Sequence, residues 1–117
     1  MAITMMDRRL GDGIFQVIAS GATQADGAFT VSFSFEKDDV RSRCVQVQVE
    51  VVGSPSTGSL AIAVRSPGAS NYATLSETVD LVNGPLLYVL RDVVVDAMRF
   101  TPTSFNGTSY NVIITAF

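Results

Sequence analysis

A run of strict two-residue alternation near the middle of the chain most constrains its fold. From Val45 to Val51 every odd position is valine, and every even position is glutamine or glutamate. Side chains of a β-strand point alternately to opposite faces, so this segment can bury its valines on one side and expose its polar residues on the other. The stretch from Phe29 to Phe35 alternates in the same way. We therefore expect antiparallel β-sheet with one buried face.

Turn-forming residues divide the chain into about eight short segments of strand character. Glycine and proline fall between these segments, and no window places apolar residues at helical spacing between helix caps. This pattern is typical of a single antiparallel β-sandwich, and periodicity does not distinguish the jelly roll from other sandwiches. The sequence predicts an all-β sandwich domain over residues 13–117, preceded by an extended N-terminal arm over residues 1–12. The strand candidates span residues 14–19, 28–35, 43–52, 60–64, 72–82, 86–90, 94–101 and 110–117.

The parity of each strand candidate selects the side chains that we expect in the core. Burying one large apolar side chain contributes about 1.5–3 kcal/mol before the loss of chain entropy is counted. The predicted core residues are Phe29, Val31, Phe33, Phe35, Val45, Val47, Val49, Val51, Leu60, Ile62, Val64, Leu75, Val79, Leu81, Met98, Phe100, Tyr110, Val112 and Ile114.

The composition argues against catalysis and metal binding. The chain has no histidine and a single cysteine, Cys44. Histidine is the commonest general base and zinc ligand, and the Ser-His-Asp triad of hydrolases requires it. Asp12, Asp26 and Asp38 fall in predicted turns, where aspartate accepts hydrogen bonds from its own backbone. We expect no enzymatic activity, no catalytic residue, no cofactor and no metal ion.

The charge pattern also limits the partners. The formal net charge is −3, and the seven arginines and one lysine form no basic stripe of the kind that binds nucleic acid. No run reaches the length of about 18 apolar residues that a membrane-spanning helix needs. Residues 1–10 lack the basic–apolar–small order of a signal peptide. We therefore expect no nucleic acid, no membrane and synthesis in a cytoplasm.

Two strand candidates and the N-terminal arm carry more apolar side chains than one buried face requires. Residues 86–90 and 110–117 are apolar on both faces, so each is either covered by its own chain or buried against another subunit. Methionine is adaptable and suits an irregular groove, and we expect the arm to pack on a neighbouring protein. The predicted interface residues are Ile3, Met5, Met6, Leu10, Leu87, Val89, Ile113 and Phe117.

An Asn-Gly pair lies between the last two strand candidates. Asn106-Gly107 is the strongest sequence signal for a two-residue type I′ turn. It predicts a hairpin that pairs residues 94–101 with residues 110–117 and fixes their register.

The end of the chain carries a motif of the form Asp-x-hydrophobic-Arg-hydrophobic-x-Pro-Thr, followed by Gly-Thr-x-Tyr-x-Val. Residues 96–103 and 107–112 fit it, and the chain ends at Ala116-Phe117. This segment resembles the ends of small structural proteins of tailed bacteriophages. The resemblance implies a virion component, such as a head decoration (cement) protein or a module of a tail or fibre.

The resemblance further implies contacts with major capsid, tail or fibre proteins, and location in the virion after synthesis in the host cytoplasm. The charge-poor composition and the two-faced strands favour a homo-oligomer. A carbohydrate- or receptor-binding module of a phage tail is the alternative. For that function Tyr72, Tyr88 or Tyr110 would have to stack on a sugar, but their places on or beside strand candidates favour packing.

Overall fold

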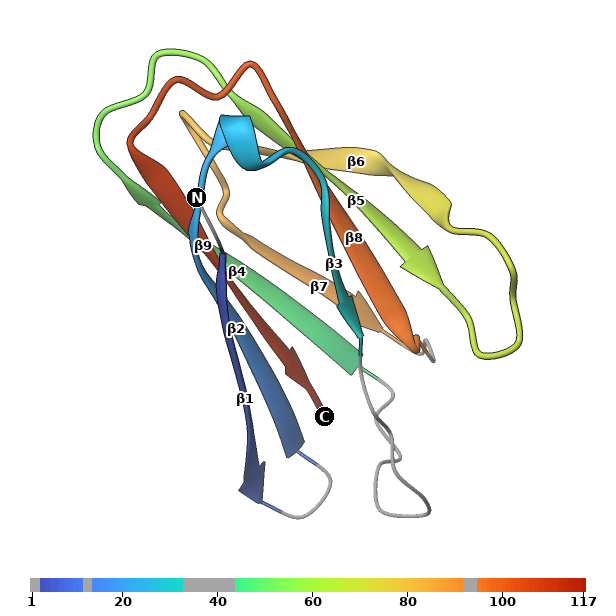
Figure 1. Cartoon of the computed structure of the whole chain (residues 1–117). Coiled ribbons are helices and arrows are strands. Elements are labelled where there is room, and N and C mark those ends of the chain that lie inside the picture. The colour runs from blue at the N-terminus through green and yellow to red at the C-terminus, as the bar shows by residue number, and fades with distance from the viewer. Residues whose placement is uncertain (1–2, 12–13, 33–43, 92–94) are drawn as a thin grey trace.

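The chain folds into two antiparallel sheets packed face to face, so the predicted all-β sandwich is confirmed (Figure 1). The computed structural model describes residues 3–11, 14–32, 44–91 and 95–117. One sheet has five strands in the order β1-β2-β9-β4-β7, and the other has four in the order β3-β8-β5-β6. The strands are β1 Thr4–Gly11, β2 Ile14–Ala22, β3 Phe29–Ser32, β4 Cys44–Val52, β5 Ser59–Arg65, β6 Ala73–Asp80, β7 Leu87–Arg91, β8 Ala97–Thr103 and β9 Ser109–Ala116.

The core lies between the two sheets and follows the parity that the sequence indicated. In β9 the even residues are buried and the odd ones are partly exposed, which is the pattern of a strand with one face in the core. Of the predicted core residues in the described part, Val51, Val64 and Leu75 are only partly buried, and all the others are buried. Phe33 and Phe35 lie outside the described residues.

The N-terminal segment is an edge strand and not an arm free of its own sheet. Strand β1 pairs with β2, with Met6 opposite Ile18 and Arg8 opposite Gln16. The prediction of an arm over residues 1–12 that is separate from the β-sandwich is therefore wrong for Thr4–Gly11. All eight residues of β1 are exposed, so its sequence does not need to alternate between apolar and polar residues. A strand that buries neither face leaves no period-two signal in the sequence.

The predicted hairpin between residues 94–101 and 110–117 is wrong as well. Strand β8 pairs with β3 and β5, whereas β9 pairs with β2 and β4 in the opposite sheet. Neither Asn106 nor Gly107 has the positive φ that a type I′ turn requires. The Asn106 Oδ1 instead accepts hydrogen bonds from the backbone N–H groups of Ser56 and Thr57, at 2.9 and 3.2 Å. Asn106 thus joins two loops that cross between the sheets.

A phenylalanine outside every strand fixes the same end of the sandwich. Phe105 is buried, and its ring meets the ring of Tyr110 edge-on at 5.4 Å between centroids. Gly58 has φ +145°, and a Cβ there would lie 2.8 Å from the Phe105 ring. Sequence parity missed Phe105 because loop residues follow no period. The two crossing loops are therefore anchored to the core.

Candidate functional site

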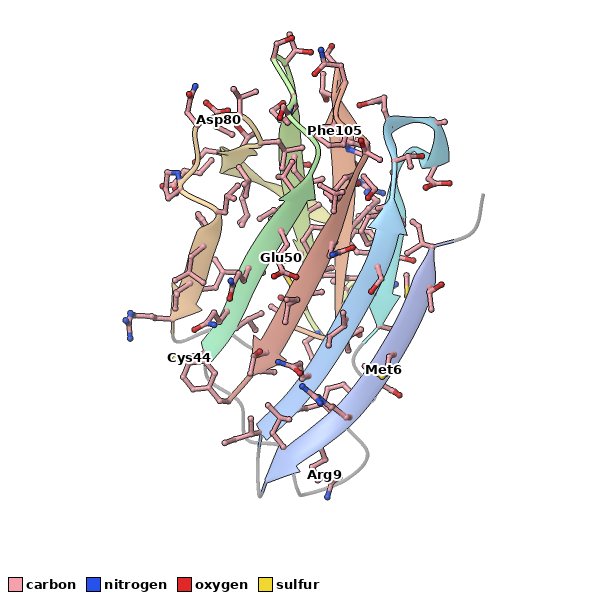
Figure 2. All side chains as sticks on the ribbon, turned by 90° about the vertical axis from the view of Figure 1, so that its left-hand side faces the viewer. Met6, Arg9, Cys44, Glu50, Asp80 and Phe105 are labelled. Atoms are coloured by element: carbon pink, nitrogen blue, oxygen red, sulfur yellow. The ribbon has the colours of Figure 1, made fainter. Side chains whose placement is uncertain are left out.

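The outer face of the five-stranded sheet is the part of the molecule with the clearest departure from the polar-outside rule. Figure 2 looks onto this face. One line of directly opposed residues crosses the whole sheet in the order Met6, Ile18, Ile113, Gln48, Leu87. Opposed side chains on one face lie about 4.5–5.5 Å apart at their Cβ atoms. We call the four apolar members, Met6, Ile18, Ile113 and Leu87, the apolar row.

The apolar row is open to solvent in the isolated chain. Met6 is 52% exposed and Leu87 is 49% exposed, while Ile18 and Ile113 between them are half-buried. Gln48 interrupts the row between Ile113 and Leu87. Beside Leu87, where β7 begins, the surface has a hollow of about 470 Å³ lined by Gln48, Glu50, Leu86 and Leu87 among others. The row therefore ends in a concave surface.

The next line across the sheet is polar except for Val89 on β7. Its members are Arg8, Gln16, Thr115, Gln46 and Val89. The Arg8 Nε donates to the Gln16 Oε1 at 2.9 Å, and the Gln16 Nε2 donates to the Thr115 Oγ1 at 3.2 Å. The side chains of Arg8, Gln16 and Thr115 thus bond to one another across β1, β2 and β9.

Beyond the polar line, a second apolar group lies at the end of β9. Phe117 exchanges two backbone hydrogen bonds with Cys44, both of 2.9 Å, and so continues the sheet past the last residue of β9. By alternation its side chain shares the outer face with Ile113, and it is 45% exposed. Ile14 stands next to it on β2 and is 37% exposed.

The structure brings five of the eight predicted interface residues to this one face: Met6, Leu87, Val89, Ile113 and Phe117. Leu10 is 48% exposed at a register shift of β1. Met5 lies on the opposite face of β1, and Ile3, which precedes β1, packs against the core. Sequence reasoning missed Ile18 and Ile14, although residues 14–19 are apolar on both faces.

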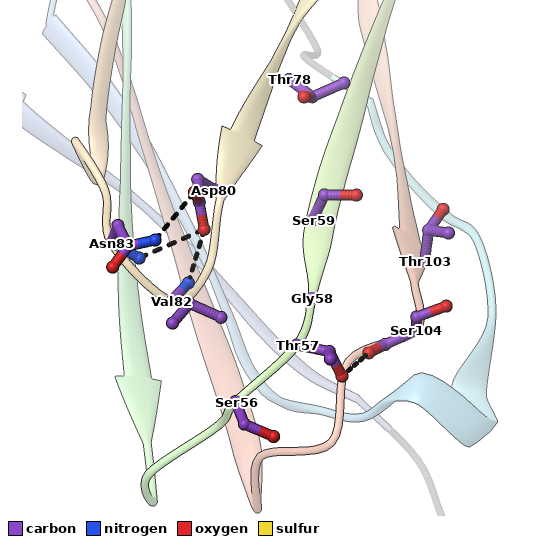
Figure 3. Close-up of a pocket in the computed structure, with 10 residues that line it drawn as sticks. All are labelled: Ser56, Thr57, Gly58, Ser59, Thr78, Asp80, Val82, Asn83, Thr103 and Ser104. Carbon is purple, nitrogen blue, oxygen red and sulfur yellow. Dashed lines mark hydrogen bonds between the residues drawn. The ribbon is translucent and has the colours of Figure 1, made fainter.

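A polar pocket of about 470 Å³ lies at the end of the sandwich where the loops cross (Figure 3). Asp80 accepts hydrogen bonds from the backbone N–H groups of Val82 and Asn83, at 2.9 and 3.1 Å, and these bonds hold the pKa of its carboxyl below the ordinary value. The carboxylate therefore supports the turn after β6. The pocket's hydroxyl groups come from Ser56, Thr57, Ser59, Thr78, Thr103 and Ser104.

None of the three tyrosines lines this pocket. Tyr110 is fully buried, and burial raises the pKa of its hydroxyl, which has no hydrogen-bond partner among the described residues. Tyr72 lies against the guanidinium groups of Arg65 and Arg99, at 5.2 and 4.7 Å from its ring centre. Burial, followed by a hydrogen bond with Glu77, raises the pKa of Tyr88. The tyrosines thus offer no stacking platform at the pocket.

No group of three or more His, Cys, Asp or Glu side chains within the described part of the chain could hold a metal ion. No helix in the described residues is long and apolar enough to cross a membrane.

No family model and no curated protein matches the chain. Among solved structures, the fold is similar to that of the SPBc2 prophage-derived protein YomS. That similarity has a TM-score of 0.50 at 9% identity and covers 99% of this chain and 95% of YomS. A carbohydrate binding module of family 29 also matches, with a TM-score of 0.43 at 14% identity, over 97% of this chain and 75% of the module. At these identities the similarity concerns the fold.

Proposed function

We propose that this chain is a non-enzymatic structural protein of a bacteriophage particle. It docks through the outer face of the five-stranded sheet onto a capsid protein or onto a tail or fibre protein. The observation that carries the proposal is the apolar row. An antiparallel sheet with one face in water normally shows polar side chains on that face, and apolar side chains gathered on such a face mark an interaction surface.

The size of the face suits such a contact. Four of the five strands have eight or nine residues and β7 has five, so with strands about 4.8 Å apart and about 3.4 Å per residue the face covers at most roughly 24 by 27 Å. Specific interfaces bury about 800 Å² of accessible surface on each partner, which a face of this size supplies once its side chains are counted. The partly exposed Phe117 adds an aromatic side chain of the kind that anchors interfaces.

Two separate observations support a phage particle as the setting. The C-terminal segment, residues 95–117, resembles the ends of small phage structural proteins. The described fold is similar to that of a prophage-derived protein. Location in the virion, after synthesis in the host cytoplasm, follows as part of this proposal.

The test is binding to purified virions of the phage that carries the gene. The variant Ile113→Thr keeps a β-branched residue and removes the apolar end of the side chain, so the strand is preserved. We expect its binding to virions in co-sedimentation to fall about tenfold, as for a central interface residue. The matched control is Thr101→Ser on β8 in the other sheet, which should bind as the unaltered chain does. Unchanged binding of Ile113→Thr would refute the docking face.

The polar pocket favours a second function, that of a carbohydrate- or receptor-binding module of a phage tail. Its hydroxyl groups and the Asn83 amide could pair with sugar hydroxyls in a concave site. The test is a glycan array with the unaltered chain, followed by Ser59→Ala and Thr78→Val. Glycan binding that both changes abolish, together with normal binding of Ile113→Thr to virions, would favour this function over docking by the sheet.

A further inference from the structure

Strand β1 has an open edge. Among the residues that the structure describes, it pairs only with β2, and the N–H and C=O groups on its other side have no strand neighbour there. Such an edge is a template for pairing with another chain unless charges, proline or a covering segment block it. All eight residues of β1 are exposed, and Met5, Met6 and Leu10 are each about half exposed. A further strand that binds at this edge would cover part of these exposed side chains.

We propose that β1 pairs antiparallel with β1 of a second copy of this chain. A two-fold axis normal to the sheet would join two five-stranded sheets into one continuous sheet of about ten strands. The contact lies at the edge of the sheet and leaves the outer face free. It therefore goes beyond the proposed docking and does not depend on it.

The charges of β1 select one register. A two-fold axis of this kind places residues of equal parity opposite each other, because opposed residues must share a face. With Arg8 at the axis, the two Arg8 residues oppose each other, Asp7 of each copy lies opposite Arg9 of the other, and Met6 lies opposite Leu10. A shift of the axis to Asp7 opposes two aspartates, and a shift to Arg9 opposes two arginines, and neither shift brings opposite charges together. Only the Arg8-centred register gives two pairs of opposite charge.

Contacts within the chain are compatible with this register. The Arg8 Nε is bound to the Gln16 Oε1 at 2.9 Å, so the guanidinium is drawn toward β2 and away from the axis. Asp7 makes no ion pair with any residue that the structure describes. An arginine has five N–H donors, so Arg9 can accept a carboxylate partner in addition to a contact that it already has. The two Asp7–Arg9 pairs would thus add to existing contacts.

The other edge of the same sheet is a poorer site for self-pairing. Strand β7 has five residues against eight in β1, and its single charged residue, Arg91, finds no opposite charge in a β7–β7 pair. Pairing of β1 with β7 of another copy would be head-to-tail, and would build a ring or a filament and not a closed dimer. The predicted assembly is therefore a dimer.

Charge reversal tests the proposal. We expect the unaltered chain to sediment as a dimer in analytical ultracentrifugation, and Asp7→Arg or Arg9→Asp to weaken the dimer about 30-fold by opposing like charges at two places. The double variant Asp7→Arg/Arg9→Asp restores two opposite-charge pairs in the same register, so it should dimerise again. Arg91→Asp is the matched control on β7 and should remain a dimer.

Cysteine cross-linking tests the register independently of affinity. Opposed residues of antiparallel strands have Cα atoms about 4.5–5.5 Å apart, which a disulfide can span. In a Cys44→Ser background, Arg8→Cys should form a disulfide-linked dimer under mild oxidation, whereas Met5→Cys should not. A monomeric unaltered chain, a dimer that withstands both single charge reversals, or loss of the dimer in Arg91→Asp would overturn the proposal. Each of these outcomes leaves the virion-binding result of Ile113→Thr unaffected.

Discussion

Each of the two sheets has one outward face, and the two faces differ in the contacts that their side chains make within the chain. On the four-stranded sheet the outward positions of β8 carry Ala97, Arg99, Thr101 and Thr103. The arginines there are occupied: Arg99 lies against Tyr72, and Arg65 is bonded to Asp96 at 3.1 Å. The hydrogen bond with Asp96 raises the pKa of the Arg65 guanidinium.

Along the apolar row, the outer face of the five-stranded sheet has no comparable contacts between its own side chains among the described residues. Ile18 and Ile113 are half-buried by their neighbours, but Met6 and Leu87 at its two ends are about half exposed. The same alternation builds both sheets, so the apolar residues there are not required by the fold. The difference indicates that side chains on the outer face of the four-stranded sheet contact one another, whereas the outer face of the five-stranded sheet suits a partner.

The largest expected effect is a difference in stability loss between substitutions on the two faces of β9. Ile114 is fully buried and Ile113 is its neighbour on the outer face. We expect Ile114→Ala to lower the free energy of unfolding by about 2–5 kcal/mol, because it leaves a cavity in the core. Ile113→Ala should cost clearly less, about 1 kcal/mol, since Ile113 is only partly buried and its loss leaves no closed cavity. Chemical denaturation of both variants measures this, and equal losses would show that the outer face is structural.

How far the sequence predicted the fold depends on whether a residue lies in a half-buried strand. Alternation from Val45 to Val51 predicted the inward side of β4, because one face of that strand is in the core. Alternation says nothing about which sheet a strand joins, so the Asn106-Gly107 pair led to a hairpin that the structure does not contain. Phe105 was missed since it lies in a loop.

The candidate site was predicted in part for the same reason. The second apolar face of β9 identified Ile113 and Phe117 as outward residues. The apolar row itself could not be predicted, because it depends on the register of five strands that are far apart in the sequence. Met6 and Leu87 lie at opposite edges of the sheet and are joined only through that register.

The next prediction concerns the end of the outer face. Phe117→Ser removes an exposed aromatic side chain but leaves the two backbone hydrogen bonds with Cys44 intact. We expect virion binding to weaken by about 2 kcal/mol, a typical loss for an aromatic residue that anchors an interface, with the melting temperature nearly unchanged. Co-sedimentation and a thermal melt give the two quantities. A variant that binds normally would restrict the docking surface to the apolar row.

A smaller effect is expected on the outer face of the other sheet. Asp96→Asn removes the ion pair with Arg65, whose two side chains are 32% (Arg65) and 30% (Asp96) exposed. Partly exposed pairs of this kind contribute up to about 1 kcal/mol, and salt screens them. We expect a loss of stability within that limit, smaller at high salt, and unaltered virion binding. Reduced virion binding would mean that the four-stranded sheet is also an interaction surface.

The smallest effect concerns acid stability at the edge of the four-stranded sheet. The Asp80 carboxylate accepts hydrogen bonds from Val82 and Asn83, which lower its pKa in the folded state below the ordinary value of 3.8. A carboxyl whose pKa is lower in the folded chain binds fewer protons there, so its stabilising contribution is full above pH 3.8 and disappears as the pH falls through the folded pKa. Asp80→Asn cannot ionise, so its stability should fall less than that of the unaltered chain between about pH 5 and about pH 2. Thermal melts across that range measure the difference, and parallel curves would show that the turn after β6 does not depend on the Asp80 charge.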